Sequence, residues 1–284
     1  MAEEQNSLMK QDALFRFLLP EARARGAIIR GKHIIEEAVD IHGLNGEAAV
    51  MFGQTLMASV MLLSISKGGI RQVLQLDASE EHTPIRRMQA ESRSGAVRGY
   101  VQWQDNPVAS LSGKNGLSAL MGEHILLSTV RDLGVGQPYV STVQYNSDWL
   151  ADYILEYLKQ SVQVHADIIL QGDLAIMIEA MPGCDDDHWF QAIETMAKIS
   201  QQTLQKEKPE VILKAFEGLG CKIVGQDTYS YDCSCSLETM EQALLTLSEE
   251  DLHDLADEAG DVILSCQYCR NHVKANVFKK EDEK

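Results

Sequence analysis

The stretch Cys233-Ser234-Cys235, followed after thirty residues by Cys266-Gln267-Tyr268-Cys269, decides the fold of the C-terminal part of this chain. Four of the six cysteines in the 284-residue sequence stand in these two close pairs. A tetrahedral metal site needs four soft ligands around one ion, and two close pairs on separate segments supply them with little rearrangement of the chain. The spacing therefore predicts that these four cysteines bind one zinc ion.

The segment between the two pairs predicts a small module that depends on the metal. Residues 237–247 and 249–259 have the pattern of two short helices, and Ser248 with Asp251 makes a capping box for the second one. From residue 238 to 261 the sequence holds nine acidic residues and no Lys or Arg. Because so small a module cannot build a self-sufficient hydrophobic core, we expect the metal to supply much of its folding free energy.

The charge of the chain argues against two classes of partner. The sequence has 42 acidic and 25 basic residues, which gives a formal net charge of −17. Recognition of phosphate groups on nucleic acids or anionic lipids needs clustered Lys and Arg, so we expect no nucleic-acid partner and no membrane partner. Apolar residues make up 45% of the sequence, which is enough to bury a core.

The N-terminal residues and the cysteines favour a cytoplasmic protein. Residues 1–6 carry acids where a signal peptide carries positive charge, and the apolar segment of a signal peptide does not follow. Cysteines in the cytoplasm stay reduced by default. We therefore expect the two pairs to be metal ligands or redox-active thiols rather than structural disulfides.

One segment has nearly the length of a membrane span. Residues 48–65 hold no formal charge over eighteen positions, which is close to the minimum for a transmembrane helix. Four polar residues, Gln54, Thr55, Ser59 and Ser64, dilute the hydrophobicity of this segment. We therefore interpret it as a buried core helix.

The N-terminal part of the chain, residues 1–180, predicts one large α+β domain. Its hydrophobic residues follow a helical period in some segments and a two-residue period in others. The predicted helices start at residues 32, 47 and 147 and end near 42, 67 and 158, and the predicted strands cover 27–31, 70–76, 96–101, 123–130 and 137–143, with strand-like runs in 162–177. Residues 12–19 predict a short amphipathic segment, and Asn115-Gly116 predicts a turn.

A change in composition at Met181-Pro182-Gly183-Cys184 marks the end of this domain. Two modest helices follow, and the second starts at Pro209. Such helices bury apolar surface by lying on another domain, so we expect this segment to be held marginally. The sequence therefore predicts three parts, namely an α+β domain at residues 1–180, a metastable helical linker at 181–232 and a zinc-binding module at 233–284.

Zinc binds thiolates rather than thiols, so each ligand cysteine is held in the form that oxidants attack. A site closed by four cysteines has no open position for water, which argues against hydrolytic catalysis. Each pair can also close a local disulfide, and two such disulfides would make a reversible switch that releases the metal. A purely structural zinc knuckle is the alternative. We interpret His272 as a surface residue, and Cys184 and Cys221 as ordinary small residues.

The sequence lacks the motifs of common enzyme sites. Gly134-Val135-Gly136 does not continue into a dinucleotide-binding pattern, because Tyr139 stands where the third glycine belongs. Gly113-Lys114 lacks the earlier glycine and the following Ser or Thr of a phosphate-binding loop. Neither a Gly-x-Ser-x-Gly nor a His-Glu-x-x-His motif occurs. We therefore expect a protein that is not an enzyme.

The residues resemble a known family, the 33-kilodalton heat-shock protein family of bacteria, whose members are redox-regulated holdase chaperones. The hallmark of that family is a Cys-x-Cys pair followed about thirty residues later by a Cys-x-x-Cys pair, as in the two pairs quoted above. The resemblance covers nearly the whole chain. It extends through Gly95-Ala96-Val97-Arg98-Gly99-Tyr100-Val101, Met121-Gly122, Asp132-Leu133-Gly134 with Pro138-Tyr139, and Tyr157-Leu158-Lys159-Gln160-Ser161.

The resemblance implies a stress-response chaperone that is inactive when it is reduced and holds one Zn²⁺ per chain. Oxidation would form the disulfides Cys233–Cys235 and Cys266–Cys269, release the zinc and unfold the linker. The exposed hydrophobic surface would then bind unfolding client proteins without ATP and prevent their aggregation under oxidative stress. The resemblance further implies that the oxidised form is a homodimer, with the N-terminal domain binding clients and forming the dimer.

Two other functions stay open on the sequence. The Cys266-Gln267-Tyr268-Cys269 pair has the spacing of a thiol-disulfide oxidoreductase, although the surrounding residues lack a thioredoxin-like βαβ pattern. A zinc-knuckle adaptor protein is the other alternative. If the chain is a chaperone, its candidate client surfaces are the apolar helix at residues 51–63 and the face that carries Trp189 and Ile193.

Overall fold

The computed structural model describes residues 11–66, 68–105, 111–244, 246–257 and 260–276. The chain divides into two units, Met1–Tyr231 and Asp232–Lys284. Helices and strands both occur in each unit, which confirms the α+β class predicted from the sequence. The second unit starts one residue before Cys233.

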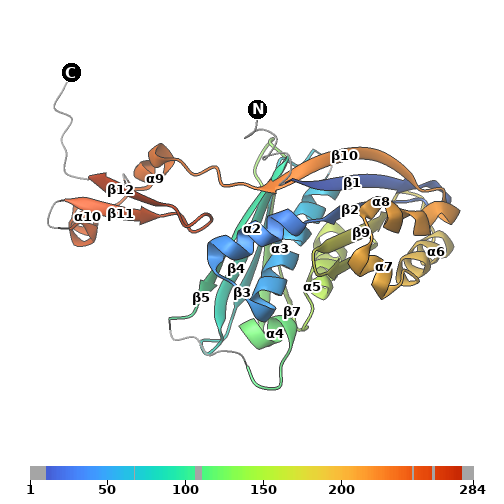
Figure 1. Ribbon diagram of the computed structural model, residues 1–284, viewed down its shortest axis with the longest axis horizontal. Coiled ribbons are helices and arrows are strands. Elements are labelled where there is room, and N and C mark those ends of the chain that lie inside the picture. The colour runs from blue at the N-terminus through green and yellow to red at the C-terminus, as the bar shows by residue number, and fades with distance from the viewer. Residues whose placement is uncertain (1–10, 67, 106–110, 245, 258–259, 277–284) are drawn as a thin grey trace. The chain divides into compact units, whose positions relative to one another are not determined.

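A ten-stranded sheet runs through the first unit in the order β7-β6-β3-β4-β5-β10-β1-β2-β9-β8 (Figure 1). Its strands are β1 (Asp12–Leu19), β2 (Ala24–Arg30), β3 (Arg71–Ala78), β4 (Ile85–Arg93), β5 (Ala96–Trp103), β6 (Ile125–Asp132), β7 (Tyr139–Tyr145), β8 (Ala166–Gln171), β9 (Leu174–Ala180) and β10 (Lys222–Tyr231). Strand β10 joins the two halves of the sheet. It pairs with β1 in antiparallel direction from Lys222 to Tyr229, and it pairs with β5 in parallel direction through Ser230 and Tyr231.

Two predicted helices cover one face of the sheet, α2 (Lys32–His42) with the predicted bounds and α3 (Gly46–Ile65), which starts one residue and ends two residues earlier than predicted (Figure 1). Helix α2 ends at Gly43, whose left-handed φ of 61° suits a residue without a side chain. Helix α3 is long and apolar enough to cross a membrane, but 78% of its apolar stretch is buried inside the unit. Residues 51–63 of α3 are all buried, so the prediction of a core helix is confirmed.

Two shorter helices complete this side, α4 (Gly116–Met121) and α5 (Leu150–Tyr157), and a π-helical turn, Leu158–Val162, follows α5. The sequence predicts a turn at Asn115-Gly116, and the structure starts α4 there instead. Gly116 has a left-handed φ of 54°, and a Cβ atom at this position would lie 2.1 Å from the backbone oxygen of Asp148. The glycine is therefore required for the close packing of this helix start.

The opposite face of β1, β2 and β9 is covered by the segment that follows residue 180. This segment contains α6 (Asp186–Ala197), α7 (Gln201–Lys206), α8 (Pro209–Ile212) and a 3₁₀ helix, Leu213–Leu219. It contributes eight buried apolar side chains to a second core, namely Ala192, Met196, Ile199, Leu204, Ile212, Leu213, Phe216 and Leu219. The predicted linker therefore packs as part of the first unit, and its release under oxidation stays a prediction.

Ten residues near the end of the predicted helical linker, Lys222–Tyr231, form strand β10, which differs from the sequence-based prediction. The strand contains the β-branched and aromatic residues Ile223, Val224, Thr228, Tyr229 and Tyr231, which favour extended backbone. Its partner strands lie far away in the sequence, so local periodicity does not reveal the pairing.

Residues 12–19, predicted as a short amphipathic segment, form strand β1. The sequence analysis also does not predict β4, because its charged residues hide the pattern of a buried strand. Glu91 in β4 is only 2% exposed. Burial by itself raises the pKa of Glu91, but hydrogen bonds from Arg71 and Arg93 and the charge of Arg98 lower it overall. The carboxylate is therefore buried as a charged group whose cost is offset by three guanidinium groups.

The second unit consists of α9 (Leu237–Leu244), α10 (Glu249–Leu255) and a hairpin of β11 (Asp261–Ser265) and β12 (His272–Asn276). The predicted capping box is present, since Ser248 and Asp251 bond to each other's backbone N–H groups. The helix predicted at residues 249–259 is too long, because α10 ends at Leu255 and Ala256 has extended backbone. Residues 258–259 and the predicted stop at Lys67 lie outside the described residues. Three buried apolar side chains form the core found in the described part of this unit, Leu244, Val262 and Ala275.

Candidate metal centre

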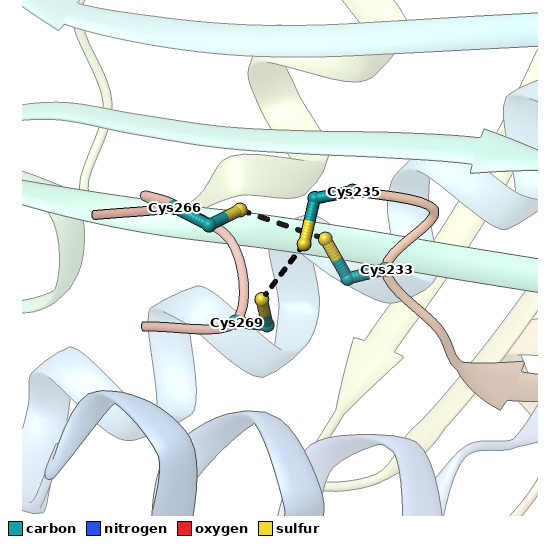
Figure 2. A group of neighbouring side chains, drawn as sticks. All are labelled: Cys233, Cys235, Cys266 and Cys269. Carbon is teal, nitrogen blue, oxygen red and sulfur yellow. Dashed lines mark hydrogen bonds between the residues drawn. The ribbon is translucent and has the colours of Figure 1, made fainter. Parts of the chain in front are cut away.

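The four cysteine sulfurs meet in the second unit. Cys233 and Cys235 lie in the segment between β10 and α9, and Cys266 and Cys269 lie in the turn between β11 and β12. The four Sγ atoms all lie within 4.8 Å of one another. Figure 2 shows that two separate loops point their sulfur atoms at the same small volume. The structure therefore brings together the four residues that the sequence analysis predicts as ligands.

The β11–β12 hairpin fixes the positions of the second pair. The two strands pair in antiparallel register from Asp261 with Asn276 to Ser265 with His272, which leaves residues 266–271 as the connection. Within this connection the Cys266 N–H donates to the Asn271 carbonyl at 2.9 Å, and the Arg270 N–H donates to the Cys266 carbonyl at 2.9 Å. These bonds close a tight turn that places both sulfurs on the same side.

Two sulfur contacts run between the two loops (Figure 2). Sγ of Cys233 lies 3.6 Å from Sγ of Cys266, and Sγ of Cys235 lies 3.3 Å from Sγ of Cys269. Around a tetrahedral zinc ion with Zn–S bonds of about 2.3 Å, the sulfurs stand roughly 3.8 Å apart. The four thiols therefore fit one such ion after small shifts, and an all-thiolate set is a donor set that zinc favours.

Two of the thiols differ in their acidity. Burial alone raises the pKa of Cys266, but the backbone N–H groups of Cys269 and Tyr268 donate to its sulfur and lower the pKa overall. Burial together with the three neighbouring sulfurs raises the pKa of Cys235 strongly. Four adjacent thiolates repel one another, so this set can ionise together only around a cation.

The remaining histidine and cysteine candidates lie outside this cluster. His272 is exposed, and its Nδ1 atom lies 2.6 Å from the Ser265 hydroxyl. The Cys184 thiol donates to the Ala22 carbonyl at 3.4 Å, and Cys221 packs against the second core of the first unit. Burial raises the pKa of both Cys184 and Cys221, so neither thiol is activated. In the described part of the chain, no second group of three metal-ligating side chains comes together.

The sequence analysis does not identify the residue that holds the end of α7. Arg30 on β2 donates from Nη2 to the carbonyl oxygens of Leu204 at 2.6 Å and Glu207 at 2.8 Å, and it forms an ion pair with Asp173. An arginine at the end of a strand looks like a solvated residue in sequence. Since its partners are backbone carbonyls about 175 positions further along, the sequence carries no signal for them.

The two candidate client surfaces are wholly or partly covered in this arrangement. Residues 51–63 of α3 are buried in the main core. Trp189 and Ile193 are partly buried, and the side of α6 that packs most deeply carries Ala192 and Met196 instead. Neither surface is therefore open for client binding as the unit stands.

Comparison with known proteins gives a consistent result. A family model described as "Hsp33 protein" matches residues 12–276. A "33 kDa chaperonin" of Geobacter sulfurreducens is 28% identical and covers 92% of this chain and 91% of its own length. The protein of the same name from Bacillus subtilis is also 28% identical, over 95% of this chain and 96% of its own. The crystal structure of the 33 kDa chaperonin (heat shock protein 33 homologue) of Thermotoga maritima superposes with a TM-score of 0.76 at 25% identity, over 94% of this chain and 95% of that one.

Proposed function

The chain belongs to the Hsp33 family, and we propose that it is a redox-regulated, ATP-independent holdase chaperone. The observation that carries this proposal is the convergence of Cys233, Cys235, Cys266 and Cys269 within 4.8 Å in a module that has little core of its own. Such a module depends on its metal for folding, so a change in the cysteines changes the fold of the whole module.

In the reduced form we propose that the four cysteines bind one Zn²⁺ per chain. The ion would hold all four sulfurs as thiolates and tie the Cys-x-Cys segment to the β11–β12 hairpin. The N–H groups of Tyr268 and Cys269 orient Cys266 and stabilise its negative charge. In this form the segment from residue 181 to 231 stays packed on the first unit, and the chaperone is inactive.

Oxidation by peroxide or hypochlorous acid is proposed to form the disulfides Cys233–Cys235 and Cys266–Cys269. In each pair two thiolates give up two electrons and form one S–S bond, and the oxidant is reduced to water or chloride. Each pair is close in sequence, which supports local bonding, although sulfur contacts also cross between the pairs in the reduced arrangement. Peptide mapping of the oxidised chain distinguishes the two pairings, and crossed disulfides would contradict this part of the proposal.

Loss of the metal is proposed to unfold the second unit and release the segment of residues 181–231. The side chains that this segment covers on β1, β2 and β9 include Phe17, Ile28 and Ile176. Once uncovered, this apolar face would bind unfolding client proteins and prevent their aggregation. The oxidised form is further proposed to be a homodimer, and its localisation is proposed to be cytoplasmic, where thiols are kept reduced until stress.

The test follows zinc content and aggregation suppression together through one cycle of oxidation and reduction. The reduced chain should contain one zinc per chain and suppress the aggregation of a heat-unfolding client poorly. Peroxide at raised temperature should release the zinc and switch suppression on, and a thiol reductant with zinc should reverse both. Cys266→Ser should lose this control, whereas Cys184→Ser should keep it. Equal suppression with zinc retained would contradict the switch.

The two alternatives from the sequence analysis have distinct tests. A thiol-disulfide oxidoreductase would turn over an insulin-type disulfide substrate catalytically. A zinc-knuckle adaptor would bind its partner in the reduced, zinc-loaded form and would lose this binding on oxidation. We propose that the chain is not an enzyme and that it has no nucleic-acid or membrane partner, in keeping with its net charge of −17.

A further inference from the structure

The first unit contains a cavity of about 440 Å³ at the C-terminal end of α3. Strands β2, β3, β6 and β9 and the π-helical turn after α5 contribute to its wall. Much of the wall is apolar and comes from Leu62, Ile65, Leu158, Val162, Val164 and Pro182. This volume lies in the range of pockets that hold small molecules, and none of the functions considered above uses it.

Arg131 is the polar residue of this cavity that most needs a partner. Along β6, buried Ile125, Leu127 and Thr129 alternate on the core side, and Arg131 is the next residue on that side. The Nε atom of Arg131 is buried without a hydrogen-bond partner, and among the described residues its guanidinium group has no ion pair and no hydrogen bond. The guanidinium group lies over the ring of Tyr139, 5.2 Å from the ring centroid. Leaving a buried charged donor unpaired is costly, so this site calls for an acceptor.

One hydroxyl group of the cavity wall also lacks a partner in the protein. Tyr157, which lines the cavity and is 4% exposed, has no hydrogen bond to any residue that the structure describes. A guanidinium group without a counter-ion and a hydroxyl without a hydrogen bond in the wall of a largely apolar cavity are typical of a site that orients a ligand by its polar end.

The other charged residues of the cavity already satisfy each other. Arg25 forms an ion pair with buried Glu179 and donates to the Ile65 carbonyl at 3.0 Å. Arg25, Glu179 and the Ile65 carbonyl therefore interact with one another, and Arg131 is the positive charge of this wall that has no counter-ion in the part of the unit that the structure describes. The Nε atom is closed to solvent, so a ligand reaches this group through the terminal nitrogens of the guanidinium. Water can accept hydrogen bonds there but cannot balance the charge, whereas an anion can do both.

We propose that this cavity binds a small carboxylic acid with a short apolar tail. The carboxylate would accept two parallel hydrogen bonds from the guanidinium group of Arg131, and the Tyr157 hydroxyl would donate to one of its oxygens. The tail would lie against Leu62, Ile65 and Leu158. A phosphate would gain nothing from the apolar wall, and its second charge would lack a cation, because Arg25 is engaged with Glu179.

The position of the cavity gives this ligand an effect on stability. Met181 and Pro182, the first residues of the predicted linker, form part of the wall. A bound carboxylate would therefore contact both the main core and the start of this segment. Because it binds the folded form alone, it should raise the thermal stability of the first unit as its concentration rises.

The experiment titrates the reduced full-length chain with sodium hexanoate and follows the Nε–Hε resonances of the arginine side chains by NMR. The resonance of Arg131 should shift in a saturable way, and calorimetry should give the same affinity. Hexanamide, which has the same tail without the charge, should bind at least tenfold more weakly, since a hydrogen bond to a charged group contributes about 1.5–3 kcal/mol. Inorganic phosphate at equal concentration should not shift the Arg131 resonance.

Variants test the assigned residues directly. Arg131→Gln should weaken hexanoate binding at least tenfold, and Tyr157→Phe should weaken it several-fold. Arg86→Gln is the matched control, because Arg86 is an exposed residue of β4 outside the cavity wall and its replacement changes the net charge equally. The proposal is overturned if the Arg131 resonance does not saturate, if hexanamide binds as well as hexanoate, or if Arg131→Gln binds like the wild type. Should Arg131→Gln fail to fold, the wild-type resonance and the hexanamide comparison decide the question.

Discussion

Arg30 on β2 donates a hydrogen bond from Nη2 to the carbonyl oxygen of Leu204 at 2.6 Å. The same guanidinium group donates to the carbonyl oxygen of Glu207, so it satisfies two backbone groups at the end of α7. Free carbonyls at the C-terminal end of a helix carry partial negative charge, and a cation there stabilises the helix. Arg30 therefore ties the predicted linker to the sheet through polar contacts.

Replacing this arginine should loosen the linker without oxidation. We expect Arg30→Gln to lower the free energy of docking of residues 201–219 by about 1–3 kcal/mol, because it removes charge-assisted hydrogen bonds. Hydrogen exchange should then rise in peptides from this segment, and zinc content should stay unchanged. Lys198→Gln is the control, since Lys198, the residue after α6, makes an exposed ion pair with Glu194 of that helix and with no other described element. Equal exchange in both variants would contradict this role of Arg30.

Phe216 should be the apolar residue on which docking of the linker depends most. It is 0% exposed, and its ring centroid lies 5.8 Å from that of Phe17 on β1. Phe216→Ala should cost about 3–5 kcal/mol, because it leaves a cavity between the segment and the sheet. We expect this variant to suppress client aggregation while it is still reduced. Val211→Ala, at a site 40% exposed, should behave like the wild type, and a reduced Phe216→Ala chain without activity would argue against release of this segment as the activating step.

Asp12 should make the stability of the first unit fall as pH rises from about 4 to 6. Burial raises the pKa of Asp12 to about 6 from its usual 3.8, against the effect of the Ile34 N–H group, which donates to its carboxylate at 2.9 Å. Within this window the folded chain keeps the proton and the unfolded chain loses it. The free energy of unfolding therefore decreases with rising pH, by up to about 3 kcal/mol.

Asp12→Asn keeps an oxygen acceptor for Ile34 and removes the charge, so it should abolish most of this pH dependence and stabilise the chain at pH 7. Urea unfolding from pH 4 to 7, followed by tryptophan fluorescence, measures the effect. The three tryptophans, Trp103, Trp149 and Trp189, all lie in the first unit, so the signal does not depend on the zinc module. Asp227→Asn, in an exposed ion pair with Arg16, is the control, and an unchanged slope in Asp12→Asn would refute the assignment.

Removing zinc under reducing conditions should unfold the second unit while the β7-β6-β3-β4-β5 part of the sheet stays folded. The three buried apolar side chains of this module contribute little, whereas structural zinc contributes about 10–16 kcal/mol in small modules. Hydrogen exchange in peptides from β11 and β12 should become fast after addition of a strong zinc chelator, and peptides from β3 and β4 should stay protected. A calcium-selective chelator serves as the control. Protection of the hairpin in the metal-free chain would show that the module folds without its ion.

The parts of the fold that the sequence predicts are those with strong local patterns. Helices α2 and α3 follow from their apolar residues and from Gly43, and the capping box of α10 follows from Ser248 and Asp251. The sequence does not predict strand β4, because the buried Glu91 pairs with arginines that are distributed over three strands. Pairing of this kind depends on the assembled sheet and leaves no periodic signal in the sequence.

The metal centre is also only partly predictable from the sequence. The spacing of the two pairs is enough to predict that Cys233, Cys235, Cys266 and Cys269 converge. The spacing does not reveal that Cys233 contacts Cys266 and Cys235 contacts Cys269, or that backbone N–H groups lower the pKa of Cys266. Both features depend on the turn between β11 and β12, a hairpin that the sequence analysis does not predict.

Strand β10, which belongs to the predicted linker, also connects the two parts of the large sheet. In the order of the sheet it stands between β5 and β1, and without it the strands form a five-stranded sheet, β7-β6-β3-β4-β5, and a four-stranded sheet, β1-β2-β9-β8. Any event that withdraws β10 therefore cuts one continuous sheet in two and leaves β5 and β1 with open backbone edges. Strand β10, which closes the largest sheet of the chain, ends two residues before Cys233. Only Asp232 therefore separates this sheet from the first cysteine of the metal centre.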